Sequence, residues 1–231
     1  MKSIKTLALV TGLLAISGVS QAQFSSTWTA VSDYDFRGFS QSAKSPALQG
    51  SADYAFANGL SIGAWASNVD FSPLDGDIEL DVYLNYVGKI NDTFSWTGGF
   101  TYYSYPGSDD IGEYPEFYLG FNAGAFSMKQ WYADKLYDSD FSGQYTEANY
   151  TASITDAFSL AFHAGYAWGD AWEDNELFDY AVQANYVAGH FTIFGKFTGT
   201  DASGDMKVTS DENNNEPRFL VGVMTTFPWG D

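Results

Sequence analysis

The stretch IELDVYLNY, residues 78–86, alternates apolar and polar side chains with a period of two. Isoleucine, leucine, valine and tyrosine fall on one face, and Glu79, Asp81 and Tyr83 fall on the other. Successive side chains of a strand point to opposite sides of a sheet, so this pattern predicts a β-strand with one apolar and one polar face.

The same alternation recurs along the chain, and it predicts about 12 strands of roughly 9–11 residues, the length with which a tilted strand crosses a bilayer. The expected strands cover residues 26–37, 47–56, 60–70, 78–87, 93–103, 115–123, 125–135, 145–154, 158–167, 178–187, 190–199 and 217–227. Short turns such as Asn58-Gly59 alternate with longer polar loops. This regularity predicts an all-β protein, a transmembrane antiparallel up-and-down β-barrel with both termini on the periplasmic side.

Aromatic residues on the apolar face gather at both ends of the expected strands, as in the aromatic belts of a membrane-spanning barrel. Those beside the short turns include Tyr54, Tyr86, Phe94, Phe121, Tyr150, Tyr186, Phe191 and Phe227. Those beside the long loops are Phe36, Tyr102, Phe117, Tyr166, Tyr180, Phe197 and Phe219. The alternative is a soluble periplasmic sandwich or lipocalin-like barrel, which would turn its apolar face inward.

The composition fits this interpretation. The 231 residues are 18% aromatic and 17% charged, with no cysteine and a formal net charge of -19. Nucleic-acid binding needs basic phosphate contacts, which such an acidic chain lacks, and the absence of cysteine excludes disulfides and cysteine-based zinc sites.

The N-terminus has the features of a secretory signal peptide. Two lysines precede an apolar run at residues 7–16, and Ser20-Gln21-Ala22 supplies the small residues of a cleavage site. We therefore expect residues 1–22 to be a signal peptide cleaved after Ala22, and residues 23–231 to form a single barrel domain in a bacterial outer membrane. The alternative, an uncleaved anchor, would need a longer apolar run.

If the apolar face meets lipid, the polar face lines a lumen. The acidic residues expected there, in a ring below the outer mouth, are Asp33, Asp35, Glu79, Asp81, Glu116, Glu147 and Asp179. The basic residues are Arg37, Lys129, Lys196 and Arg218, and the aromatic ones are Trp65, Tyr83, Tyr103, Tyr118 and Trp131. Two interpretations stay open: the ring favours passing cations, or the charges pair with one another and fill the interior.

The sequence gives little support for catalysis, and we expect neither an enzyme nor a metal or cofactor site. It contains only two histidines, His163 and His190, and no nucleophile elbow, zinc-protease motif or phosphate loop. A barrel-embedded hydrolase would require His163 beside a hydroxyl such as that of Ser159 or Thr151.

Four segments in the first third of the chain are shared, in order, with a known family. They are VSDYDFRGFSQS at residues 31–42, PALQGS at 46–51, GAWASNVDF at 63–71 and ELDVY at 79–83. This combination resembles the opening signature of the TorF family of porin-like barrels. The resemblance implies a small proteobacterial outer-membrane barrel, and it brings no established substrate and no binding residue.

Together these patterns predict a porin-like channel for passive diffusion of small cationic or neutral solutes. Its expected partners are outer-membrane lipid, lipopolysaccharide, the barrel-assembly machinery and small solutes, but no nucleic acid. The alternatives are a closed structural or surface-interaction barrel and, more remotely, the hydrolase.

Overall fold

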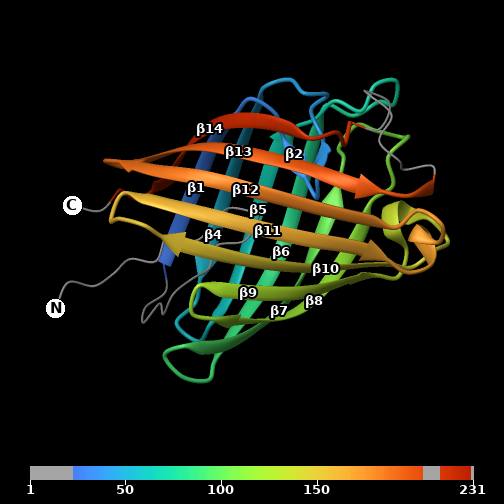
Figure 1. The fold of residues 1–231 in the computed structure, drawn as a ribbon. Helices are drawn as coiled ribbons and strands as arrows, with labels where there is room; N and C mark the ends of the chain where they lie inside the picture. The colour runs from blue at the N-terminus through green and yellow to red at the C-terminus, as the bar shows by residue number, and fades with distance from the viewer. Residues whose placement is uncertain (1–22, 205–213, 230–231) are drawn as a thin grey trace.

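Twelve antiparallel strands close into a barrel in the computed structural model, which describes residues 23–204 and 214–229 (Figure 1). The barrel strands are β1 (Gln23–Val31), β4 (Ala47–Ala55), β5 (Leu60–Asn68), β6 (Ile78–Lys89), β7 (Phe94–Ser104), β8 (Tyr114–Ala123), β9 (Phe126–Ala133), β10 (Gly143–Ser153), β11 (Phe158–Trp168), β12 (Leu177–Ala188), β13 (Phe191–Ala202) and β14 (Arg218–Phe227). The predicted up-and-down barrel is confirmed. The predicted signal peptide, residues 1–22, lies outside the described residues.

The first and last strands close the barrel. Trp28 of β1 is paired with Gly50 of β4 on one side and with Thr225 of β14 on the other. Figure 1 shows that β1 begins and β14 ends at the same end of the barrel, where the short turns lie. The long loops gather at the opposite end and include two single 3-10 turns, η1 (Leu136–Asp138) and η2 (Asp170–Trp172).

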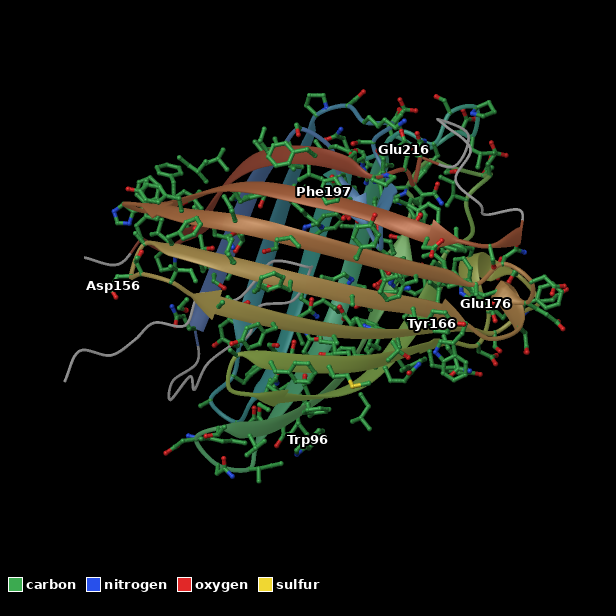
Figure 2. The ribbon with its side chains drawn as sticks, viewed as in Figure 1. Trp96, Asp156, Tyr166, Glu176, Phe197 and Glu216 are labelled. Atoms are coloured by element: carbon green, nitrogen blue, oxygen red, sulfur yellow. The ribbon has the colours of Figure 1, made fainter. Side chains whose placement is uncertain are left out.

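Apolar side chains cover the outer wall, which is the inverse of a soluble protein and the surface that a bilayer would cover. Figure 2 shows Trp96, Tyr166 and Phe197 on this wall. The exposed aromatic residues near the long loops include Phe117, Tyr132, Tyr166, Phe178, Phe197 and Phe219. Within the described residues, no helix is both long and apolar enough to cross a membrane.

The first predicted strand is too long. We predicted residues 26–37, but β1 ends at Val31 and the chain then turns into the barrel. Residues 32–42, here called the inserted segment, contain a small hairpin of β2 (Asp35–Phe36) and β3 (Phe39–Ser40). Its turn passes through Gly38, whose φ of 85° favours glycine.

Phe36 therefore does not belong to the outer aromatic belt, as its alternation predicted. Its ring lies inside the barrel, 6.0 Å from the ring of Tyr103. The physical reason is that the neighbouring charges of the inserted segment find opposite charges on the inner wall, which carries Phe36 inward with them. The other predicted segments differ from the observed strands only at their ends.

Candidate functional site: the barrel lumen

The polar inner wall places the predicted acidic residues in the interior. Glu79 and Asp81 come from β6, while Glu116, Glu147 and Asp179 come from β8, β10 and β12. All five are buried, as is Asp33 of the inserted segment. Asp33, Asp35 and Arg37 thus lie in the lumen, but they reach it from the inserted segment rather than from β1.

Arg37 attaches the tip of the inserted segment to β8. Its two terminal nitrogens donate to the two carboxylate oxygens of Glu116 over 2.9 and 2.6 Å. The guanidinium also lies 4.0 Å from the centre of the Tyr145 ring, a favourable cation–π distance. Such a bidentate interaction is typical of arginine, because two N–H groups of its planar guanidinium align with the two oxygens of a carboxylate.

A second group of ion pairs attaches the start of the inserted segment to β13 and β14. Arg218 donates to Asp33 and, over 2.6 Å, to Asp35. Lys196 donates to the other oxygen of Asp35 over 2.6 Å. Burial acts to raise the pKa of the Asp35 carboxyl, but Lys196 and Arg218 outweigh it and hold that pKa below its ordinary value.

His163 joins β10, β11 and β12. Its Nε2 lies 2.8 Å from Asp179 and 3.0 Å from the Tyr145 hydroxyl, and its Nδ1 lies 2.7 Å from Asn149 Oδ1. Neither of the hydroxyls required by the hydrolase alternative is a hydrogen-bond partner of His163 in the described part of the chain. His190 lies at the short-turn end, where its ring stacks on that of Trp229.

Lys129 lies over the rings of Tyr118 and Trp131, 4.9 and 5.2 Å from their centres. It is the cross-strand neighbour of Glu147, whose carboxylate also accepts a hydrogen bond of 2.8 Å from Trp131 Nε1. The four predicted lumen cations therefore all lie beside acidic groups on the side of the barrel formed by β8–β14 and the inserted segment.

Glu79 and Asp81 of β6 differ from these acidic residues because no described cation pairs with them. Only 2% of Glu79 and 7% of Asp81 is exposed, and Glu79 Oε2 and Asp81 Oδ1 have no hydrogen-bond partner among the described residues. Neither carboxylate forms an ion pair with any residue that the structure describes.

A cavity of about 180 Å³ lies within the lumen, and Asp81 lines it. Of the predicted aromatic residues, Trp65, Tyr83, Tyr103 and Trp131 also line it, while Tyr118 packs against Trp131 with 4.5 Å between ring centres. Tyr34 and Tyr145 also line the cavity, although neither was predicted to do so. The period of two identifies Tyr145 as inward on β10, but no local pattern places Tyr34.

A closed barrel with an apolar outside, a polar inside and long loops at one end defines a porin-like transmembrane β-barrel. The chain belongs to the family described as "Bacterial protein of unknown function (Gcw_chp)", whose model matches residues 15–227. Comparison with curated proteins finds no match.

Solved porin structures share this fold. The chain is similar to the structure titled "KdgM porin", with a TM-score of 0.58 and 15% identity, covering 88% of this chain and 99% of that one. A structure of "KdgM porin in complex with disordered oligogalacturonate" gives a TM-score of 0.57 at 14% identity, covering 88% and 99%. A NanC porin gives a TM-score of 0.57 at 11% identity, covering 89% and 100%. At these identities the likeness concerns the fold.

Proposed function

We propose that this protein is an outer-membrane channel for passive diffusion of small cationic or neutral solutes. The observation that carries the proposal is the lumen cavity, because Asp81 lines it and forms no ion pair with a described residue. A carboxylate in such a position favours cations and repels anions because the surrounding wall screens its field poorly.

The outer loops support the same preference. Their described residues carry many more acidic than basic side chains, and Figure 2 shows Glu176 and Glu216 at the long-loop end. The other loop acids are Asp70, Asp75, Asp77, Asp109, Asp110, Glu113, Asp134, Asp138, Asp140, Asp170, Glu173 and Asp174. An acidic mouth raises the local concentration of cations.

The charge of the lumen also bears on the class of solute. One KdgM porin structure is a complex with oligogalacturonate, an acidic ligand. Glu79 and Asp81 form no ion pair with a described residue and favour a solute of the opposite charge, so we propose that this barrel differs from KdgM in selectivity.

The proposal includes the remaining sequence-based assignments. We propose cleavage after Ala22, a single barrel domain over residues 23–231, a place in the bacterial outer membrane, and membership of the TorF group within the wider family. Outer-membrane lipid, lipopolysaccharide and the barrel-assembly machinery are the proposed partners, and no enzymatic activity is proposed.

A closed structural barrel is the second candidate, and the inserted segment favours it. Ion pairs to β8, β13 and β14 hold this segment inside the outer half of the lumen. A barrel closed in this way would work through its loops rather than through a pore.

Planar-bilayer recording separates the two candidates. The purified full chain should give discrete current steps in potassium chloride, and a salt gradient should give a reversal potential of the sign expected for cation preference. A barrel verified to be folded and inserted that carries no current would overturn the channel in favour of the closed barrel. A preference for anions would overturn the proposed preference for cations but not the channel itself.

A further inference from the structure

We propose that the outer half of the lumen contains a binding subsite for a small primary ammonium group, formed by Asp81 and Glu79 with the rings of Tyr34, Trp65 and Tyr103. This inference deepens the proposed function, since it gives the channel a class of solute, and it rests on that function for its biological meaning.

The first reason is that two buried carboxylates each have one oxygen without a hydrogen-bond donor among the described residues. Among the described acids of the lumen, Asp33, Asp35, Glu116, Glu147 and Asp179 all accept hydrogen bonds from cationic or polar side chains. Glu79 Oε2 and Asp81 Oδ1 accept none from the described residues. Buried oxygens of this kind are normally satisfied, so their open positions indicate a missing donor.

The second reason is the ring of aromatic side chains around Asp81. In the sheet register Asp81 is paired with Trp65 of β5 on one side and with Tyr103 of β7 on the other. Tyr34 of the inserted segment lies 5.3 Å from Trp65 between ring centres. All four side chains line the cavity.

Carboxylate and aromatic groups together recognise an organic cation. A positive charge is attracted to the face of an aromatic ring, and a short alkyl chain packs against the same surface. A primary ammonium has three N–H donors and no acceptor, which fits carboxylate oxygens that lack donors. A quaternary ammonium has the charge but no donor, and a neutral alcohol lacks the charge.

The described cations of the barrel do not fill this position. Arg37, Lys196 and Arg218 bind Glu116, Asp33 and Asp35, and Lys129 lies beside Glu147. Within the described residues, no group of three or more histidine, cysteine or carboxylate side chains could hold a metal ion.

Isothermal titration of the detergent-solubilised full chain with propylammonium, tetramethylammonium and propanol tests the subsite at neutral pH and fixed ionic strength. Propylammonium should bind most tightly and propanol should show no binding. Asp81→Asn should weaken propylammonium binding by about tenfold or more, because it replaces a charge-assisted hydrogen bond by a neutral one. Glu79→Gln and Trp65→Leu should weaken it too.

Asp53→Asn is the matched control. Asp53 is another buried inward carboxylate, but it accepts hydrogen bonds from Tyr83 and Ser51 and does not line the cavity. This variant should bind propylammonium as the wild type does. Circular dichroism and heat-modifiable gel migration show whether each variant is folded, and the independent Glu79 and Trp65 variants keep the test valid if Asp81→Asn fails to fold.

Four results would overturn the subsite: no binding of propylammonium, equal binding of tetramethylammonium, full competition by equimolar potassium chloride, or an equal loss in the Asp53 control. The titration needs no membrane current. Binding without conductance would therefore contradict the channel alone, and conductance without binding would contradict the subsite alone.

Discussion

Gly165 shows how single residues shape the inner wall of this barrel. It lies on β11 between Glu147 of β10 and Asp179 of β12 in the sheet register. The side chain of Tyr145 lies across it so that its hydroxyl reaches Asp179 over 2.9 Å. A Cβ at this position would collide with the Tyr145 hydroxyl and with Asp179 Oδ2. The glycine thus makes room for the hydrogen bonds around His163.

Gly165→Ala should destabilise the barrel by about 1–3 kcal/mol, the usual cost of forcing extra volume into a packed interior. Urea unfolding of the reconstituted protein measures this difference in the free energy of unfolding. Gly98→Ala is the control, because the new Cβ would meet its nearest neighbour at 3.4 Å, an ordinary contact. Equal stability of the Gly165 variant and the wild type would contradict the described packing.

Among the elements, the inserted segment is the one whose position depends most on ion pairs. It contains little regular structure, and two groups of ion pairs hold it against β8 on one side and against β13 and β14 on the other. Its position in the lumen therefore depends on side-chain charges as well as on backbone pairing.

Arg37→Ala should destabilise the protein strongly. Glu116 is only 1% exposed at its side chain, and without Arg37 its charge would be buried and unpaired. Removing one partner of such a pair typically costs about 3–5 kcal/mol. Urea unfolding of Arg37→Ala, Glu116→Gln and the double variant measures the coupling between them. Additive effects would show that the ion pair does not hold the segment.

Acid should release the start of the inserted segment. Because the pKa of Asp35 is lowered in the folded protein, its charge contributes stability that is present above the unfolded value of about 3.9 and is lost as the pH falls through the lower folded value. After correction for the intrinsic pH dependence of amide exchange, the protection of residues 32–42 against hydrogen exchange should therefore fall only below about pH 4. Asp35→Asn should show lower protection already at neutral pH, and a wild-type protection that does not change with pH would contradict the role of Asp35.

At the scale of the whole molecule, the charge of the lumen is asymmetric. The inserted segment and the wall from β8 to β14 combine acids with cations, whereas β6 presents Glu79 and Asp81 without ion pairs to described residues. We expect ions that pass through the barrel to follow the β6 side.

Replacing Glu79 by Gln together with Asp81 by Asn should lower the cation-to-anion permeability ratio, because it removes two carboxylates that form no ion pair with a described residue, and Asp81 lines the cavity. The reversal potential in a potassium chloride gradient measures this ratio. Asp156→Asn, an acid at the short-turn end (Figure 2), is the control and should leave the ratio close to that of the wild type. An unchanged ratio in the double variant would refute the assigned ion path.

Much of the lumen could be predicted because strand geometry is local. The alternation of apolar and polar residues at 78–86 is enough to predict that Glu79 and Asp81 lie on the inner face. The same holds for Glu116, Glu147 and Asp179 in their strands. The prediction failed at residues 32–37, where alternating aromatic and charged residues continue the pattern of a strand although the chain has left the sheet.

The sequence by itself determined the strands, their two faces, the number of crossings and the end of the barrel at which the long loops lie, since each follows from residues close together in the chain. Only the tertiary structure decided which charges remain unpaired. Arg218 and Asp33 are 185 residues apart, and they meet because β14 closes the barrel against β1. The ion pairs that draw residues 32–42 inward depend on that closure, as do the two carboxylates that form no ion pair with a described residue.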